Sequence, residues 1–482
     1  MALMTGAQYE ESLRRMKHKV YMFGELVDTP VDHPIIRPSM NAIKLSYDLA
    51  QDPMYADLMT ATSHLSGQKV NRFGHLHQST DDLIKKVKML RLMGQKTCAC
   101  FQRCAGMDAT NASYGITYEM DQKLGTVYHK RFLNFFQKVQ EEDLIVAAGV
   151  TDAKGDRGLA QNKQPDPDLF VRIVERKVDG IVVRGCKCHT TAATNAHMVL
   201  VMPTQAIAAD AKDYAVSFVT PADAEGIVYV FGRQSCDTRK TENSNVDVGN
   251  PKYGSQEALM IFDDLFVPWE NVLMDGETEW AGPLVERFAT YHRTSYGGCK
   301  PGQGDVIVGM AALMADYNGT AKASHVKDKI IEMIHLNETL YSQGIAASAE
   351  GYKTPAGNYM VDLLLSNCCK HNVTRFTYDI TRLLEDIAGG ILVTLPSEKD
   401  FDHPVAGGFM KKYLQGSNVS AENRIKLLRL IENMTFGTGA VGYKTESMHG
   451  AGSPQAQRIQ VQRYGNIGNK KALVKTLLDI TD

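Results

Sequence analysis

The pattern of apolar positions divides the chain into three stretches with different periodicity. Up to about residue 140, apolar residues recur at intervals of three and four, which is typical of helices that bury one face. From there to about residue 275, short β-branched and aromatic runs are separated by Pro, Gly and Asp turns, which is typical of strands. The helical period then returns and indicates a bundle. We therefore predict an α+β protein with a helical domain over 1–144, an antiparallel β-domain over 145–275 and a helical bundle over 276–482.

Local signals place individual elements within these stretches. Helices are expected to begin near Thr5 and at Thr80-Asp81-Asp82, because short polar side chains cap the first turn of a helix. Residues 400–408 are expected to form a loop. The expected strands cover 180–190, 198–202, 215–220, 227–231 and 259–267, and the expected C-terminal helices cover 326–349, 360–387 and 421–436.

The helix that begins at Thr80 carries a feature of chemical interest. Its apolar positions start at Leu83 and continue at alternating spacings of four and three, which brings Cys100 and Cys104 onto the same expected face. Cys98 would be rotated by about 200° from Cys100 at 100° per residue, so it is expected to point elsewhere. Spacing therefore selects two of three neighbouring cysteines.

Composition excludes several classes of protein. The chain has 482 residues, 44% apolar and 22% charged, with a net charge of −2, which argues against binding to nucleic acid or to an anionic membrane surface. The most apolar run near the middle, Leu144 to Val150, is far shorter than the roughly 20 residues that span a bilayer. The N-terminus lacks the apolar core of a signal peptide. Nine cysteines without such a signal indicate a reducing compartment, and we expect a cytoplasmic protein.

Four residues far apart in the chain are candidate metal ligands. Cys100 and Cys104 are four apart, and His292 and Cys299 are seven apart, which equals two helical turns. Three thiols and an imidazole suit an iron–sulfur cluster or zinc, and the ligand types alone leave both open. Two cysteines on a helix face are more often simply buried. The glycines and the proline around Cys299 suggest a backbone bent around a close group. Such a bend favours a metal site over two simply buried cysteines.

Two glycine-rich turns are candidates for contact with a cofactor. Residues 151–158 follow an apolar run and include Asp156 and Arg157, and such a turn can present N–H groups and a guanidinium to a phosphate or a flavin. From composition alone, a surface turn is the simpler interpretation. In residues 386–390 the Gly-Gly pair is first of all a signal for the end of a helix.

Two carboxylates lie among small residues. Glu257 precedes an apolar strand, and Glu446 and His449 occur in a segment rich in Gly, Ser and Ala. Small neighbours leave room for a ligand, although a solvated loop is the simpler interpretation of the segment around Glu446.

Taken together, residues 97–106, 151–158, 291–300 and 446–457 resemble the 4-hydroxybutyryl-CoA dehydratase family, and the resemblance extends over essentially the full chain. Phenol-hydroxylating flavin monooxygenases share the fold of this family but are not expected to carry the cysteines. The resemblance implies an acyl-CoA dehydrogenase-like architecture with FAD and a [4Fe–4S] cluster. It also implies that the cluster ligands are Cys100, Cys104, His292 and Cys299, that the catalytic residues are His292, Tyr296, Glu257, Glu446 and Lys300, and that Thr190 lies beside the flavin.

The resemblance further implies the reaction and the partners. The expected activity is radical dehydration of 4-hydroxybutyryl-CoA to crotonyl-CoA, together with vinylacetyl-CoA Δ-isomerase activity. A CoA thioester is the expected substrate, and a homo-oligomer, most simply a homotetramer, is the expected assembly. Further expected contacts with FAD come from Asp156 and Arg157 and, in a neighbouring subunit, from Asp386, Gly389 and Gly390.

Two alternatives stay open from the sequence. One is a flavin monooxygenase of the same fold, which would need a reductase partner but no iron. The other is a non-catalytic protein in which a structural zinc ion stabilises a helical scaffold.

Overall fold

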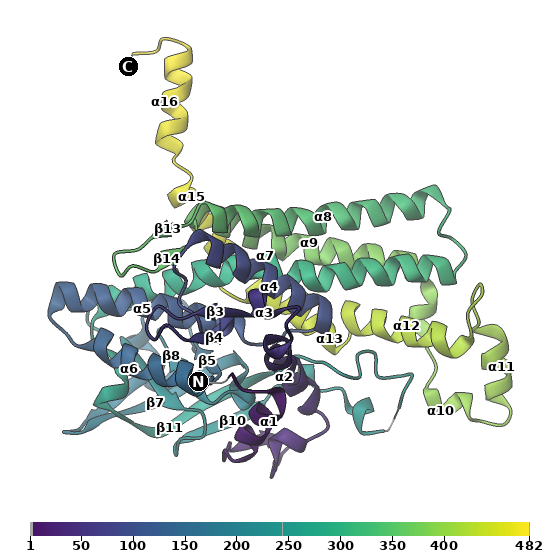
Figure 1. Ribbon diagram of the computed structural model, residues 1–482, viewed down its shortest axis with the longest axis horizontal. Coiled ribbons are helices and arrows are strands. Elements are labelled where there is room, and N and C mark those ends of the chain that lie inside the picture. Colours follow the sequence, from purple (N-terminus) through teal and green to yellow (C-terminus); the bar gives the residue numbers. More distant parts are fainter. Residues whose placement is uncertain (1–2, 243, 482) are drawn as a thin grey trace.

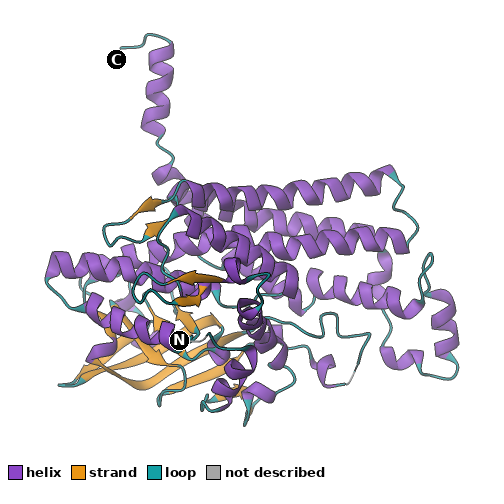
Figure 2. Cartoon of the chain, viewed as in Figure 1, coloured by secondary structure: helices purple, strands orange, loops and turns teal. Residues whose placement is uncertain are grey.

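The computed structural model describes residues 3–242 and 244–481, and the long helix α7 (Thr278–Tyr317) lies at its centre. Helices from both ends of the chain pack against α7 (Figure 1). Figure 2 shows most of the strands gathered on one side of these helices. Because α7 contacts α4, α5, α8 and α9, its side chains meet residues that are distant in sequence.

The N-terminal helices begin where their capping residues predict. Thr5 caps α1 in a reciprocal capping box with Gln8, and Ser79 caps α4 one residue before the expected start. A short hairpin, β3 (Thr60–Thr62) with β4 (Lys69–Asn71), precedes α4. The helices are α1 (Gly6–Arg14), α2 (Arg37–Gln51), α3 (Ala56–Met59), α4 (Thr80–Thr97), α5 (Cys104–Leu124) and α6 (Tyr128–Glu141).

The prediction of one helix running through Cys100 and Cys104 is wrong. Helix α4 ends at Thr97, and Cys98 follows it in the left-handed conformation with φ of 46°. Cys100 lies in the irregular segment between the helices, and Cys104 is the first residue of α5. A left-handed residue ends a helix, so the rotation argument does not apply to Cys98, which packs against the apolar core of the C-terminal helices.

Two sheets pack face to face in the middle of the chain. The larger has the order β2-β1-β10-β11-β7-β6, and the smaller has the order β12-β9-β8-β5. Neighbouring strands are antiparallel except for β1 with β10 and β5 with β8. The strands are β1 (Val20–Met22), β2 (Glu25–Leu26), β5 (Val146–Gly149), β6 (Arg172–Arg176), β7 (Gly180–Thr191), β8 (Met198–Val201), β9 (Val216–Pro221), β10 (Ile227–Phe231), β11 (Glu257–Pro268) and β12 (Val272–Asp275).

All five expected strands are present, and one apolar core fills the space between the sheets. The outer face of the smaller sheet is covered by α5 and α6 through a second core. Since β1 and β2 come from the N-terminal segment, the larger sheet is not built from residues 145–275 alone. Domain boundaries at 144 and 275 stay a prediction.

The C-terminal segment is mostly helical, and α7, α8 and α9 lie alongside one another (Figure 1). The expected loop at 400–408 is wrong, because α10 and α11 occupy most of it. No helix in the described part of the chain is long and apolar enough to cross a bilayer. The remaining elements are α8 (Ser324–Ala349), β13 (Tyr352–Lys353), β14 (Tyr359–Met360), α9 (Leu363–Ala388), α10 (Glu398–Phe401), α11 (Ala406–Tyr413), α12 (Ala421–Thr435), α13 (Thr438–Ala440), α14 (Glu446–His449), α15 (Pro454–Tyr464) and α16 (Ile467–Leu477).

Candidate active site

The four candidate metal ligands lie where α5 begins against the middle of α7. Cys100, Cys104, His292 and Cys299 are all buried, with 6–7% of each residue exposed. Cys104 and Cys299 belong to the same apolar cluster, and the charge of Cys104 acts on Cys100. Burial raises the pKa of all three thiols, that of Cys299 to about 11. Loss of these protons therefore requires a strongly attractive partner such as a metal centre.

A buried carboxylate orients His292. Asp108 lies one turn after Cys104 on α5, and its Oδ2 is 2.8 Å from His292 Nδ1. Ser295 Oγ donates to the same oxygen at 2.8 Å, and Lys86 Nζ donates to Oδ1 at 2.5 Å. Burial by itself would raise the pKa of Asp108, but Lys86 and His292 hold it below its usual value. An ionised carboxylate at Nδ1 makes that nitrogen the donor, which leaves Nε2 free to act as a ligand or base.

The glycines near Cys299 serve helix packing. Helix α7 continues through Gly297, Gly298 and Pro301. These residues therefore do not produce the expected bend around a ligand. A Cβ at Gly298 would lie 2.5 Å from the Val87 carbonyl oxygen of α4, and one at Gly297 would lie 2.7 Å from Gly344 of α8. The small residues therefore let α4 and α8 approach α7 closely.

Glu446 lies in ordered helical structure, so the solvated-loop interpretation is wrong. A π-helical turn, Val441–Thr445, leads directly into α14, which begins at Glu446. Lys300 Nζ donates to the Gly442 carbonyl at 2.5 Å and lies 3.3 Å from Glu446 Oε2. Glu446 Oε1 is 3.9 Å from Cys100 Sγ. Lys300 thus holds this carboxylate beside a candidate ligand. His449 is exposed at the end of α14.

Glu257 is a buried carboxyl group with one unpaired oxygen. It begins β11 opposite Thr191 of β7, and its Oε1 accepts a hydrogen bond from the Thr191 hydroxyl at 2.5 Å. Its Oε2 has no hydrogen-bond partner among the described residues. Burial, followed by the charge of Glu446, raises the pKa of Glu257 well above its usual value. Thr190, on the next rung of the same strand pair, is also buried.

Tyr296 connects these groups. It follows His292 by one turn of α7, with ring centroids 5.2 Å apart, and its hydroxyl donates to the Glu446 carbonyl oxygen at 3.4 Å. Burial, followed by the charge of Glu446, raises the pKa of its phenol well above its usual value. The phenol is therefore neutral and available as a proton donor at neutral pH.

Lys370 of α9 is a site residue that the sequence did not indicate. Its Nζ donates to the Ser447 carbonyl at 2.5 Å and lies 4.6 Å from the centre of the Tyr296 ring, while Lys300 Nζ lies 5.1 Å from the same centre. Burial, and then the charges of Lys300 and Arg293, lower the pKa of Lys370 to about 7. Lys370 lies four residues from each of the buried residues Ser366 and Thr374, so the helical period places it on the buried face of α9. A buried lysine needs a partner, and this spacing was the available signal.

The other predicted residues lie outside this group. Asp156 and Arg157 are in an exposed turn, and the Arg157 guanidinium makes no hydrogen bond to any described residue. Asp386 forms an ion pair with Lys329 at 2.6 Å. Gly389 ends α9 with φ of 80°, so the predicted helix end is confirmed, and Gly390 is exposed. No contact in the described part of the chain joins these residues to His292 or Glu257.

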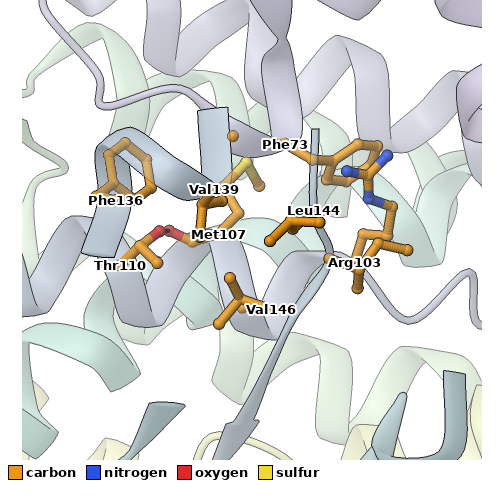
Figure 3. Close-up of a pocket in the computed structure, with 11 residues that line it drawn as sticks. Phe73, Arg103, Met107, Thr110, Phe136, Val139, Leu144 and Val146 are labelled. Carbon is orange, nitrogen blue, oxygen red and sulfur yellow. Dashed lines mark hydrogen bonds between the residues drawn. The ribbon is translucent and has the colours of Figure 1, made fainter. Parts of the chain in front are cut away.

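A crevice beside α5 does not belong to the site. Figure 3 shows Arg103, Met107 and Thr110 among the residues that line it. Its lining includes none of the candidate ligands or catalytic side chains, and Arg103 and Thr110 are rotated by about 100° or more around α5 from Cys104 and Asp108. The crevice is therefore a packing gap behind the site.

The described residues contain no group of three His, Cys, Asp or Glu side chains close enough to hold a single metal ion. Cys104 and Cys299 nevertheless share one apolar cluster with Tyr296, the Tyr296 ring packs against His292, and the charge of Cys100 acts on Tyr296. Acid–base groups and the candidate ligands thus lie near one another in the buried interior.

Comparison with known proteins defines the class. Models of the 4-hydroxyphenylacetate 3-hydroxylase N-terminal and C-terminal regions match residues 5–274 and 281–479. The chain therefore belongs to the 4-hydroxyphenylacetate 3-hydroxylase family. A structure of the oxygenase component of 4-hydroxyphenylacetate 3-monooxygenase complexed with FAD has a TM-score of 0.87, with 26% identity over 98% of both chains. Glutaryl-CoA dehydrogenase, at 12% identity and a TM-score of 0.50, shares the fold over 81% of both chains.

Within this family the chain is similar to 4-hydroxybutyryl-CoA dehydratases over its whole length. It is 59% identical to the 4-hydroxybutyryl-CoA dehydratase/vinylacetyl-CoA Δ-isomerase of Clostridium aminobutyricum, over 99% of this chain and 100% of that protein. It is 55% identical to the structure of an oxygen-tolerant archaeal 4-hydroxybutyryl-CoA dehydratase from N. maritimus, with a TM-score of 0.98 over 100% of this chain and 96% of that one. The predicted resemblance is confirmed.

Proposed function

We propose that this protein dehydrates 4-hydroxybutyryl-CoA to crotonyl-CoA and also isomerises vinylacetyl-CoA. The observation that carries the proposal is the 59% identity over the whole chain to an enzyme with both activities. The site supports it independently, because soft ligands, a buried acid and a neutral phenol share one volume.

The donor set supports a [4Fe–4S] cluster held by Cys100, Cys104, His292 and Cys299. Three thiols buried from water and an imidazole fixed by Asp108 are donors that can hold iron in such a cluster. The imidazole would make one iron different from the other three, and a ligand exchanges more readily there than at a thiolate-bound iron.

FAD is the second cofactor that we propose. Relatives of the same fold are complexed with FAD. In this chain Thr190 is a buried residue one rung from Glu257 in the pairing of β7 with β11, and the free Arg157 guanidinium suits a phosphate. When bound, FAD would supply one-electron chemistry and the cluster would supply a Lewis-acid iron.

The difficulty of the reaction lies in the position of the protons. The thioester acidifies the α-hydrogen, whereas the β-hydrogen is not acidic and the γ-hydroxyl is a poor leaving group. His292 Nε2 is the nitrogen that Asp108 leaves free for iron, and we assign it the removal of the α-proton only if it is displaced from the cluster. Tyr296, one turn away and held neutral by burial, is suited to protonate the departing hydroxyl.

Glu257 and Glu446 are suited to the remaining proton transfers. The raised pKa of Glu257 keeps it protonated near neutral pH, and its unpaired Oε2 is free to face the substrate. Glu446 is oriented by Lys300. Lys300 and Lys370 hold the carbonyls of Gly442 and Ser447, which fixes the segment that carries Glu446. The chain thereby positions its acids and bases before substrate arrives.

We also propose that the protein is a homotetramer. Helix α16 extends away from the body (Figure 1) and exposes Leu473, Leu477 and Leu478, of which Leu477 is 81% exposed. Exposed apolar groups of this kind mark interfaces between proteins. The turn around Asp386 and Gly390 is our candidate for contact with the flavin of a neighbouring subunit.

Turnover of defined substrates tests the proposed function. The anaerobically purified protein should convert 4-hydroxybutyryl-CoA to crotonyl-CoA without a reductase. A flavin monooxygenase of the same fold would instead consume oxygen and hydroxylate a phenol when supplied with reduced flavin. That outcome, with no crotonyl-CoA formed, would refute the dehydratase assignment.

A further inference from the structure

The segment over residues 441–452, which carries Glu446, is held by donors from two helices of the bundle. Four buried side chains of α7 and α9 each donate a hydrogen bond to a backbone carbonyl of this segment. The pairs are Lys300 with Gly442, Tyr296 with Glu446, Lys370 with Ser447 and Arg293 with Ala451. Three of these donors belong to the site described above, and Arg293 is the fourth.

Arg293 ties the turn after α14 to both helices. Its Nε donates to the Ala451 carbonyl oxygen at 3.0 Å, and its Nη1 donates to Asn367 Oδ1 of α9 at 2.7 Å. Asn367 is itself fully buried, so it fixes the direction of the guanidinium. Because a guanidinium is a planar fork, one side chain sets the position of the turn against α7 and α9 together.

The turn has a backbone conformation that depends on its surroundings. Ala451 has φ of 57° and Gly452 has φ of 97°, both in the left-handed region. A left-handed residue that is not glycine is uncommon, and it persists where neighbouring groups hold it. On the inner side of the turn there is no spare room, since a Cβ at Gly450 would collide with the Tyr296 hydroxyl oxygen. The position of the turn therefore sets the space around this phenol.

Arg293 also carries a buried charge, and it forms no ion pair with a carboxylate among the described residues. Burial lowers the pKa of Arg293 to about 10, which leaves the side chain charged at neutral pH. Bonds to a carbonyl and an amide do not require a charge, and burial of an unpaired charge is costly. The charge acts on Lys370, whose pKa is lowered first by burial and then by Lys300 and Arg293. Glu446 and Cys369 oppose this effect.

We propose that Arg293 is a positioning residue for the reaction, which holds the turn after α14 and keeps a positive charge near Lys370. Through the turn it acts on Glu446 and on the Tyr296 phenol, and through its charge it acts on the ammonium that lies over the Tyr296 ring. The inference deepens the proposed function and rests on it, because that function assigns proton transfers to Glu446 and Tyr296.

Amide hydrogen exchange of the holoprotein tests the hold on the turn. Arg293→Gln should speed exchange over residues 441–452 by about tenfold or more, as expected for loss of a charged hydrogen bond. Arg293→Lys should speed it less, since an ammonium can keep one of the bonds but cannot reproduce the fork. Arg287→Gln is the matched control on α7, because it removes a partly exposed ion pair with Glu119 and should leave this segment unchanged.

The rate of dehydration as a function of pH tests the charge. Arg293→Gln should lower kcat by about tenfold or more with little change in KM, because displaced proton-transfer groups slow the reaction without weakening substrate binding. Its alkaline limit should move upward by about half a pH unit or more, since loss of a neighbouring positive charge raises the pKa of Lys370. Arg293→Lys keeps the charge and should keep the wild-type limit. A purely structural role would lower kcat without moving the limit.

Two results would overturn the inference. One is exchange over residues 441–452 that is the same in the wild type and Arg293→Gln, and the other is an alkaline limit that Arg293→Gln leaves unmoved or that both Arg293 variants move equally. If Arg293→Gln does not fold, Arg293→Lys decides, because unchanged exchange in that variant also overturns the inference. A wild type that does not dehydrate 4-hydroxybutyryl-CoA, with exchange that rises as expected in the variants, would contradict only the proposed function.

Discussion

At the scale of single residues, burial sets the protonation of the side chains on which the proposed reaction depends. Tyr296, Glu257 and Lys370 each have a pKa displaced toward the neutral form by burial first and by neighbouring charges second. Desolvation disfavours the charged form of any group, so acids are held protonated and a lysine is held close to neutrality. The site is thus supplied with proton donors before substrate binds.

Tyr296→Phe is predicted to separate the two activities. Dehydration should fall by about a hundredfold or more, because the departing hydroxide loses its proton donor. Isomerisation of vinylacetyl-CoA should fall much less, since no hydroxide leaves. Both rates are measured anaerobically on one preparation. Tyr291→Phe is the control on the same helix, since among the described residues its hydroxyl bonds only to the Tyr359 backbone and to Asn358. An equal loss of both activities in Tyr296→Phe would remove the phenol from its assigned role.

Lys370→Arg is predicted to move the alkaline limit of dehydration upward. The pKa of Lys370 is lowered to about 7, so its ammonium is present below that pH and is lost as the pH rises through it. The charge next to the Tyr296 ring is lost with it, and dehydration should decline above about pH 7. An arginine stays charged, so its decline should begin at higher pH.

The prediction for Lys370 is checked by measuring the rates of dehydration and isomerisation as a function of pH in the wild type and in each variant. Lys370→Met should dehydrate slowly at every pH, without the decline near neutrality. Identical alkaline limits in the wild type and Lys370→Arg would show that Lys370 does not act through its charge.

At the scale of elements, the site depends on the close approach of α4 and α7. A Cβ at Gly302 would lie 2.1 Å from the Arg91 carbonyl oxygen of α4. Gly302→Ala should therefore force the helices apart and destabilise the protein by about 1–3 kcal/mol. Gly309→Ala is the control on α7, because nothing lies within 4 Å of its added Cβ, and it should be neutral or stabilising by up to about 1 kcal/mol.

Apparent melting temperatures with the cofactors bound distinguish these two variants. Gly302→Ala should melt well below the wild type and Gly309→Ala at or slightly above it. Similar melting of both variants would mean that the contact between α4 and α7 is not tight.

The elements that the sequence predicted are those with local causes. Thr5 and the polar residues before α4 cap their helices whatever the rest of the chain does, and β-branched runs form strands wherever one face is buried. The end of α4 at Cys98 has no such signal, because its left-handed residue is a cysteine and not a glycine. The short helices α10 and α11 were missed because Pro404 and two glycines obscure their period.

The site was predictable as a set of residue types but not as a network. Cys100, Cys104, His292 and Cys299 were selected by spacing and resemblance, although Cys100 and Cys104 do not share a helix. Asp108 meets His292 and Lys370 meets Ser447, both more than 70 residues away, so the sequence places neither in the site. The buried spacing of Lys370 on α9 indicates only that it needs a partner, not which one. The ligand set and the catalytic roles stay predictions.

At the scale of the whole molecule, the proposed tetramer uses surfaces that a single chain leaves exposed. Replacing both Leu473 and Leu477 of α16 with Glu should lower the molar mass measured by light scattering, because charge cannot be buried in an apolar contact. The control is Lys471→Glu, which lowers the net charge by as much as the two leucine replacements do. Lys471 lies on the opposite face of the helix. We expect FAD content to fall with the molar mass. A monomeric wild type that retains all its FAD would contradict the proposed assembly.

The central claim is that Cys100, Cys104, His292 and Cys299 hold one [4Fe–4S] cluster beside the acids of the site. Analysis of iron, acid-labile sulfide and zinc in anaerobically purified protein tests it most directly. The claim predicts about four irons and four sulfides per chain in the wild type and in Cys98→Ala, with both lost in Cys100→Ala. Stoichiometric zinc without sulfide, or equal loss of iron in Cys98→Ala and Cys100→Ala, would contradict it.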